Sequence, residues 1–271
     1  MLATKDLTVR FGGHVAVNAV TCAFQPGTLT AIVGPNGAGK TTYFNLISGQ
    51  LKASAGQVTL DGRELSGFSA SQRTRAGLGR AFQLTNLFPR LSVLENVRLA
   101  VQATRSGPHR HGFNLWSIWS DHKALTQRAD EVLHAVGMAG KENELVANLP
   151  HGDQRKLEVA LLMALESKVF MFDEPTAGMN AAEVPVILNL IRKLKEDASK
   201  TILLVEHKMD VVRELADRII VLHNGSLVAD GLPAEVIASP IVQEAYLGVS
   251  AAPEPTRGAL PAEVERQAEV E

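Results

Sequence analysis

The feature that most constrains this chain is a glycine-rich loop between an apolar run and a helical pattern. Residues 34–41 read Gly-Pro-Asn-Gly-Ala-Gly-Lys-Thr and match G-x-x-x-x-G-K-[ST] at every fixed position. Residues 29–33 predict a buried strand before the loop, and residues 41–48 predict a helix after it. Glycines let successive backbone N–H groups turn toward one anion, and the helix presents its positive end to that anion. The loop therefore predicts a binding site for nucleotide phosphates.

Two side chains of this phosphate loop (residues 34–41) are expected to contact the nucleotide or its metal ion. Lys40 supplies a positive charge to the β- and γ-phosphates, and the hydroxyl of Thr41 is a ligand for Mg²⁺. A nucleoside triphosphate with Mg²⁺ is therefore the predicted ligand. The residues expected to contact it here are Gly34, Pro35, Asn36, Gly37, Ala38, Gly39, Lys40, Thr41 and Thr42.

Two acids follow a second apolar run. Residues 169–172 predict a buried strand, and Asp173 and Glu174 come directly after it. An Asp at the carboxyl end of such a strand lies where Mg²⁺ binds, and the next residue can polarise an attacking water. Taken alone, the pair could equally be a solvated acidic turn. Beside a complete phosphate loop, a magnesium ligand and a catalytic base are the favoured interpretation.

Composition excludes several classes of protein. Hydrophobic residues make up 45% and charged residues 21%, as in ordinary globular proteins. The formal net charge of −2 gives no general basic field for binding nucleic acid. The single cysteine, Cys22, excludes an internal disulfide and fits a reducing compartment. Residues 11–39 lack charged side chains, but polar residues, Pro26 and several glycines divide the run into pieces too short for a membrane span.

The order of elements predicts an α/β fold with a mostly parallel sheet, an N-terminal antiparallel β region and an inserted helical subdomain. We expect one domain over residues 1–248, the helical subdomain at about 84–150 and a disordered tail at 249–271. Expected strands are 7–11, 15–24, 29–33, 57–60, 169–172, 201–205, 218–222 and 227–229. Expected helices are 41–48, 91–102, 123–136, 157–165, 184–195 and 209–215, with a loop at 105–122.

Five motifs in order make this chain resemble the ATP-binding-cassette ATPases, the nucleotide-binding subunits of membrane transporters, over residues 2–248. Besides the phosphate loop they are Arg-Ala-Phe-Gln at 80–83, Leu-Pro-His-Gly-Asp-Gln at 149–154, Phe-Asp-Glu-Pro at 172–175 and Val-Glu-His at 205–207. Three further segments resemble the ATPases of branched-chain amino-acid importers. They are Leu-Phe-Pro at 87–89, Val-Leu-Glu-Asn-Val at 93–97 and Ala-Tyr-Leu-Gly at 245–248.

The resemblance implies roles that residue type alone does not give. Gln83 matches the glutamine that reaches Mg²⁺ and the attacking water, so that Thr41, Gln83 and Asp173 form the expected metal set. His207 matches the histidine that contacts the γ-phosphate. Phe11 matches the aromatic residue that stacks on adenine, a contact with little base specificity. ATP and Mg²⁺ are the ligands that the family implies.

Two positions depart from the family pattern. The signature segment (residues 149–154) lacks the usual serine, because Pro150 stands in its place. Gly152 and the helix after it can still donate backbone N–H groups to the phosphate of a nucleotide held by a facing cassette. We expect His151 to replace the lost hydroxyl. Asn180 stands where the family commonly has Asp, in a loop that crosses the cassette interface.

The family also implies partners and a location. Two cassettes, identical or not, face head to tail, because one chain cannot bring its own signature segment onto its own ATP. Integral membrane permease subunits and, indirectly, a periplasmic or extracellular substrate-binding protein are expected, with no nucleic acid. The chain would lie peripherally at the cytoplasmic face of the plasma (inner) membrane. Branched-chain or related amino acids are the first expected cargo; urea or short amides, or a soluble cassette ATPase outside transport, are the alternatives.

Overall fold

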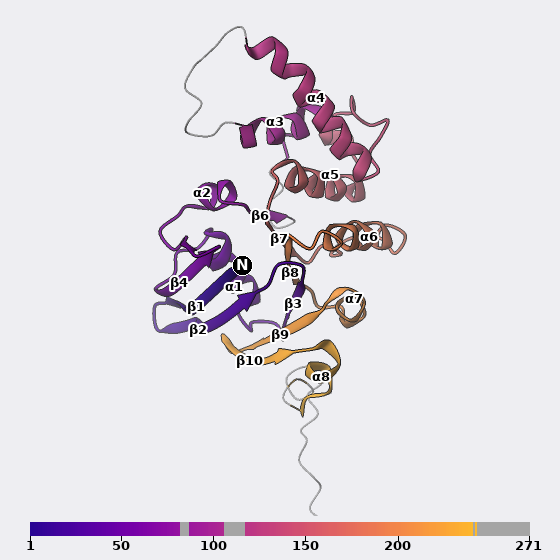
Figure 1. Ribbon diagram of the computed structural model, residues 1–271. Coiled ribbons are helices and arrows are strands. Elements are labelled where there is room, and N and C mark those ends of the chain that lie inside the picture. The colour runs from indigo at the N-terminus through magenta and orange to yellow at the C-terminus, as the bar shows by residue number, and fades with distance from the viewer. Residues whose placement is uncertain (82–86, 106–116, 241, 243–271) are drawn as a thin grey trace, which may run out of the picture.

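Two β-sheets and the helices around them form the fold of the computed structural model (Figure 1). The structure describes residues 1–81, 87–105, 117–240 and 242. Gln83, the centre of the loop expected at 105–122 and the tail expected at 249–271 lie outside this part of the chain. In the part described, no helix is both long and apolar enough to cross a membrane.

The smaller sheet is antiparallel, as predicted, and has the order β2-β1-β4-β5. Its strands are β1 (Leu2–Phe11), β2 (His14–Phe24), β4 (Ala55–Leu60) and β5 (Arg63–Glu64). Strand β1 begins five residues before the predicted start. The pairing of β1 with β2 shifts register between Thr4 and Leu7, and Asp6 has a φ of 49°. This irregularity breaks the two-residue alternation that reveals strands in a sequence.

The larger sheet has the order β10-β9-β3-β8-β7-β6 and is parallel except for β10, which confirms the predicted mostly parallel core. Its strands are β3 (Leu29–Val33), β6 (Leu78–Ala81), β7 (Val169–Asp173), β8 (Thr201–Val205), β9 (Arg218–His223) and β10 (Ser226–Gly231). Strand β6 was not predicted, because its four residues include a glycine and an arginine. It forms through parallel pairing with β7.

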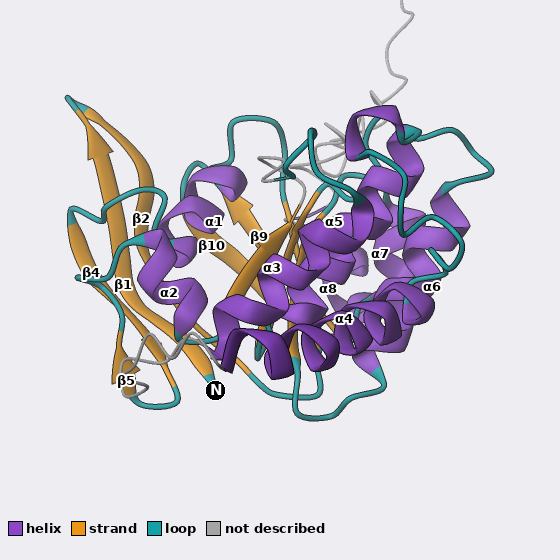
Figure 2. Cartoon of the chain, turned by 90° about the horizontal axis from the view of Figure 1, so that it is seen from above, coloured by secondary structure: helices purple, strands orange, loops and turns teal. Residues whose placement is uncertain are grey.

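Helices cover both faces of the larger sheet (Figure 2). Between the two sheets lie α1 (Lys40–Ser48) and α2 (Ala70–Arg75), whereas α6 (Val184–Lys195), α7 (Met209–Leu215) and α8 (Pro233–Ala238) lie on the far side. Alternate residues of β7 enter two different hydrophobic cores. Met171 packs with the buried side chains of α1, and Phe170 and Phe172 pack with those of α5 and α6.

A group of helices inserted between β6 and β7 lies together at one end of the molecule (Figure 1). It comprises α3 (Val93–Arg105), α4 (Ser117–Ala135), the short 3₁₀ helix η1 (Val146–Asn148) and α5 (His151–Ala164). Two of these helices begin six residues before their predicted starts. Helix α4 begins at Ser117, inside the expected loop. Helix α5 begins at His151, six residues before the predicted start, because its first turn is polar and shows no apolar spacing.

Candidate functional site

The predicted site residues gather at one edge of the larger sheet because its central strands are parallel. Ile32 of β3 lies beside Val205 of β8, and Asp173 of β7 also pairs with Val205. The carboxyl ends of three strands therefore meet, and the residues that follow each strand become neighbours. The phosphate loop follows β3, the pair of acids ends β7, and His207 lies two residues after β8.

The phosphate loop takes a path that only glycine allows at two points. Gly34 has a φ of 150°, and a Cβ atom there would lie 2.1 Å from the carbonyl oxygen of Leu222. Gly39 has a φ of 95°, and its Cβ would lie 2.5 Å from the carbonyl oxygen of Ala16. The loop thus runs against the backbones of β9 and β2, while Gly37 stands in open space. Such a close fit is a cradle for an anion near backbone N–H groups.

Lys40 lies folded over this loop. Its Nζ atom donates hydrogen bonds to the carbonyl oxygens of Gly34 and Pro35, at 2.7 and 2.9 Å. Burial lowers the pKa of Lys40, and the nearby charges of Glu174 and Asp173 act in the opposite direction. The ammonium group is therefore held where phosphates would meet it. Thr41 and Thr42 follow it, half-buried in the first turn of α1.

Asp173 is buried and paired with a residue that the motifs did not assign. Arg80 of β6 donates from Nη2 to Asp173 Oδ2 at 2.8 Å, and from Nη1 to Asn45 Oδ1 at 2.6 Å and Ser48 Oγ at 3.0 Å. Burial raises the pKa of Asp173, and the Arg80 charge opposes that rise. Arg80 thus joins β6, β7 and α1 around one carboxylate. The signal in the sequence was its place in the Arg-Ala-Phe-Gln motif at 80–83, which assigned a role to Gln83 alone.

Glu174 and His207 form a second pair at the same edge. The two side chains meet at 2.6 Å between Oε1 and Nε2, and each is 40% exposed. Glu174 has a φ of 50°, a conformation that non-glycine residues rarely adopt, and its N–H donates to the carbonyl oxygen of Val205 at 2.9 Å. A carboxylate and an imidazole therefore face solvent together, beside the phosphate loop, as general base chemistry requires.

A buried acid beside this pair was also missed. Glu206 is 2% exposed and accepts a hydrogen bond from Thr176 at 2.6 Å. An acid that directly follows the apolar run of β8 was the signal for it. Gln83, expected to complete the metal set, lies outside the described residues.

The oxygen atoms of Thr41 and Asp173 are hard ligands of the kind that Mg²⁺ prefers. Thr41 lies in the first turn of α1, directly after the phosphate loop, and Asp173 is the last residue of β7. These residues fit the predicted metal. Phe11, the expected adenine contact, is 52% exposed at the tip of the β1–β2 hairpin. The same hairpin touches the loop through the carbonyl group of Ala16 near Gly39.

The signature segment lies elsewhere in the molecule. Helix α5 lies beside α3 and α4, away from α1 (Figure 1). His151 is exposed in its first turn, and Asp153 is held by Lys141 at 2.5 Å and Lys156 at 2.8 Å. Glu183 lies against Gly152, where a Cβ atom would be 2.5 Å from its Oε1. Asn180 is exposed, and its Oδ1 accepts from the N–H groups of Ala182 and Glu183 at 3.0 Å each.

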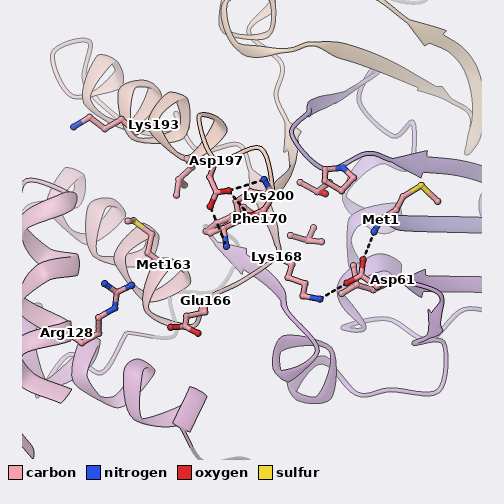
Figure 3. Close-up of a pocket in the computed structure, with 16 residues that line it drawn as sticks. Met1, Asp61, Arg128, Met163, Glu166, Lys168, Phe170, Lys193, Asp197 and Lys200 are labelled. Carbon is pink, nitrogen blue, oxygen red and sulfur yellow. Dashed lines mark hydrogen bonds and ion pairs between the residues drawn. The ribbon is translucent and has the colours of Figure 1, made fainter. Parts of the chain in front are cut away.

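A cavity of about 810 Å³ lies at the opposite edge of the sheet, where β7 and β8 begin (Figure 3). It is lined by charges that pair with each other, such as Lys168 with Asp61 at 2.6 Å and Lys200 with Asp197 at 3.9 Å. None of the predicted site residues that the structure describes lines it. Those residues gather at the carboxyl edge and not at this cavity.

Comparison with known proteins agrees with this geometry. The family model "ABC transporter" matches residues 17–177, and the model "Branched-chain amino acid ATP-binding cassette transporter" matches residues 226–252. The high-affinity branched-chain amino acid transport ATP-binding protein LivG of Salmonella typhimurium is 37% identical over 92% of this chain and 98% of its own length. BraF of Pseudomonas aeruginosa, which carries the same description, is 34% identical over the same shares.

Solved structures give the same result. The ADP conformation of MJ1267, an ATP-binding cassette of an ABC transporter, has a TM-score of 0.76 and 26% identity, covering 92% of this chain and 99% of that one. A dimeric, post-hydrolysis state of the cassette MJ0796 bound to ADP and Pi has a TM-score of 0.71 and 26% identity, covering 86% and 99%.

Proposed function

This chain belongs to the ABC transporter family of ATP-binding proteins and is an ATPase, and on that premise we propose that it powers the import of branched-chain amino acids. The cargo rests on the relatives matched over 92% of the chain, and on the family model matched by residues 226–252. Urea or short amides, and a function outside transport, were the alternatives from the sequence. No relative named above supports either one.

The chemistry assigned to the site follows from where its residues lie. The backbone of the phosphate loop and the Lys40 ammonium bind the phosphates of ATP. Thr41 and Asp173 would hold Mg²⁺, which supplies charge neutralisation at the phosphate oxygens. Glu174 accepts a hydrogen bond from the water that attacks the γ-phosphorus, as the bond to the β-phosphate oxygen breaks. His207, 2.6 Å from Glu174, positions that carboxylate and donates to the γ-phosphate.

A second cassette completes the site in this proposal. Helix α5 lies away from α1 in the same chain, and His151 in its first turn is exposed, so this residue is available to a facing subunit. There Gly152 and His151 would donate to the γ-phosphate held by the partner, and the loop at Asn180 would lie along the interface. The facing cassette is identical or a close relative; permease subunits and, through them, a substrate-binding protein are the further partners. In this proposal the chain lies peripherally at the cytoplasmic face of the plasma (inner) membrane.

The observation that carries the proposal is the meeting of Lys40, Asp173, Glu174 and His207 at one sheet edge in a chain so similar to named importer subunits. The experiment is uptake by cells whose only copy of this chain carries Lys40→Ala. We expect uptake of labelled leucine, isoleucine and valine at low external concentration to fall at least about tenfold, since one removed charge-assisted phosphate contact is worth about 1.5–3 kcal/mol. Lys193→Ala, which replaces an exposed lysine, is the control, and cells that carry it should take up the labelled amino acids at the normal rate.

Labelled urea gives the opposing arm of the same experiment. If the variant loses urea uptake but keeps leucine uptake, urea replaces branched-chain amino acids as the proposed cargo. The assignment of the chain as an ATPase would still hold. Unchanged uptake of every solute, with the variant present at normal abundance, would contradict a role in import.

A further inference from the structure

We propose that Glu206 is a positioning residue for ATP hydrolysis: its buried carboxylate ties Thr176 to the backbone of His207, and so keeps the Glu174–His207 pair in register. The inference rests on the proposed roles of Glu174 and His207. Glu206 would touch neither ATP nor the attacking water. Its loss should lower kcat, and the test below distinguishes this effect from a loss of stability.

The first observation is where Glu206 places its carboxylate. The residue is 2% exposed, and it directly follows the apolar strand β8, whose five residues are all buried. Burying a carboxylate costs several kcal/mol unless hydrogen bonds replace its water. An apolar side chain would fill such a position at lower cost. A charge at this depth therefore calls for an account of what its oxygen atoms hold.

Each oxygen atom of Glu206 holds a different segment. Oε1 accepts from the hydroxyl of Thr176 at 2.6 Å. Oε2 accepts from the backbone N–H groups of His207 at 2.8 Å and Lys208 at 3.2 Å. Thr176 is itself 1% exposed and lies two residues after Glu174. One carboxylate thus fixes the turn after β7 and the turn after β8 at the same time.

A second link joins the same two turns. His207 reaches from the turn after β8 to Glu174 in the turn after β7, at 2.6 Å. Glu206 reaches from the first of these turns to Thr176 in the second. The two links close a ring of contacts through Glu174, Thr176, Glu206 and His207. These two side-chain links add to the backbone hydrogen bond from the Glu174 N–H to the Val205 carbonyl oxygen, at 2.9 Å. They join the two turns beyond the ends of the strands.

The backbone of Glu174 shows why this support is needed. Its φ of 50° is a strained conformation for a non-glycine residue, and such strain persists only where surrounding contacts over-determine it. Without the Thr176–Glu206 link, the turn can relax and move the Glu174 carboxylate. A displacement of about 1 Å at a catalytic group can lower the rate by roughly 100-fold. The phosphate loop connects β3 to α1 and is not part of this ring of contacts. We therefore expect the ring to have little effect on the affinity for ATP.

The test compares four variants by ATP hydrolysis and by the Kd of a fluorescent ATP analogue. We expect Glu206→Ala and Thr176→Val to lower kcat by roughly 10–100-fold, with the KM for ATP and the Kd changed less than about threefold. Glu206→Gln should keep kcat within about threefold of wild type, because the amide oxygen can accept from both backbone N–H groups and its NH₂ can donate to Thr176. Thr176→Ser keeps the hydroxyl and should behave in the same way.

Thr4→Val is the matched control. Thr4 is 2% exposed in β1, and its hydroxyl makes a buried hydrogen bond with Tyr43 at 2.8 Å. This substitution removes a similar bond in the smaller sheet, whereas the catalytic pair follows strands of the larger sheet. We therefore expect kcat to stay within about twofold while the midpoint of urea unfolding falls. If Glu206→Ala does not fold, the comparison of Thr176→Val with Thr176→Ser decides.

Three results would overturn the proposal: unchanged kcat in Thr176→Val, an equal loss of kcat in Thr4→Val, or a Glu206→Gln variant as slow as Glu206→Ala. Failure of the proposed function gives a different result. In that case Glu174→Gln would hydrolyse ATP at the wild-type rate, and the ring would have no catalytic pair to position.

Discussion

At the scale of single residues, the Arg80–Asp173 contact shows how the site accommodates buried charges. The two side chains are 7% and 5% exposed, so neither charge is solvated by bulk water. Each charge is compensated by the other at 2.8 Å, and Arg80 also donates to Asn45 and Ser48. The exposed ion pair of Arg128 with Glu131, at 3.0 Å, has 48% and 51% exposed side chains and lacks this dependence. An ion pair therefore contributes very differently to the stability of the fold at these two places.

We predict that Arg80→Met lowers the free energy of unfolding by about 3–5 kcal/mol, because it leaves the Asp173 carboxylate buried and unpaired. The matched substitution Arg128→Met should cost less than about 1 kcal/mol. Urea denaturation of both variants, followed by circular dichroism, measures the difference. Equal losses in the two variants would contradict the prediction.

The loss in Arg80→Met should also depend on pH. Burial raises the pKa of Asp173 above its ordinary value of 3.8, and Arg80 lowers it, so the substitution raises it further. A carboxyl with a raised pKa in the folded state stabilises the fold at low pH, and this stabilisation is lost as the pH rises through that pKa. The difference from wild type should therefore shrink as the pH falls from 7 toward 4.5. A constant difference would mean that lost packing causes it.

How much of the site the sequence predicts depends on the kind of contact. Motif spacing brought Lys40, Asp173 and Glu174 to attention, and the structure places all three at one edge. Arg80 and Glu206 act through partners 93 and 30 residues away, and strand order alone makes them neighbours. Sequence spacing carries no record of strand order. Such contacts were therefore out of reach, although both residues stood inside motifs.

At the scale of elements, the unit formed by β3, the phosphate loop and α1 depends on two close backbone approaches. The loop leaves β3 at Gly34, against the carbonyl oxygen of Leu222 at the end of β9. Helix α1 begins after Gly39, against the carbonyl oxygen of Ala16 in β2. The loop thus contacts the backbone of both sheets, and these contacts fix the direction of α1 toward the expected phosphate site.

We predict that Gly34→Ala destabilises the protein by roughly 3 kcal/mol or more, because its Cβ would lie 2.1 Å from a backbone oxygen of β9. Gly37→Ala is the control. Its φ of 79° is also positive but nothing lies within 4 Å of the new atom, so it should cost only about 1–2 kcal/mol. Thermal unfolding followed by circular dichroism compares them. Equal costs would mean that positive φ, and not the close approach, requires glycine at residue 34.

Elements with regular apolar spacing were predictable, and those held by tertiary contacts were not. The bounds of β3, β8, α6 and α7 agree with the sequence prediction at both ends. Strand β6 exists because β7 offers it a parallel partner, and its arginine is accommodated by Asp173. The polar first turn of α5 gives no apolar period, although Asp153 is anchored there by two lysines.

At the scale of the whole molecule, the phosphate loop and the signature segment are separate surfaces of one subunit. The first lies at the carboxyl edge of the larger sheet, and the second lies with the inserted helices (Figure 1). In the proposed dimer, a nucleotide held by one chain therefore meets α5 of a second cassette. Hydrolysis would reopen that pair, so the lifetime of the dimer depends on the catalytic pair at its interface.

We predict that Glu174→Gln converts the chain into an ATP-stabilised dimer. The amide cannot accept the proton of the attacking water, so ATP stays intact and continues to join the subunits. Sedimentation velocity with ATP should show a dimer for Glu174→Gln, and a monomer for Lys40→Ala, which cannot hold the phosphates. In wild type, the hydrolysis rate per subunit should rise with protein concentration. A high rate that does not depend on concentration, or a Glu174→Gln variant that hydrolyses ATP normally, would contradict the shared site. If the variant binds ATP but stays monomeric, the site needs a non-identical cassette, and adding that cassette should restore the dimer.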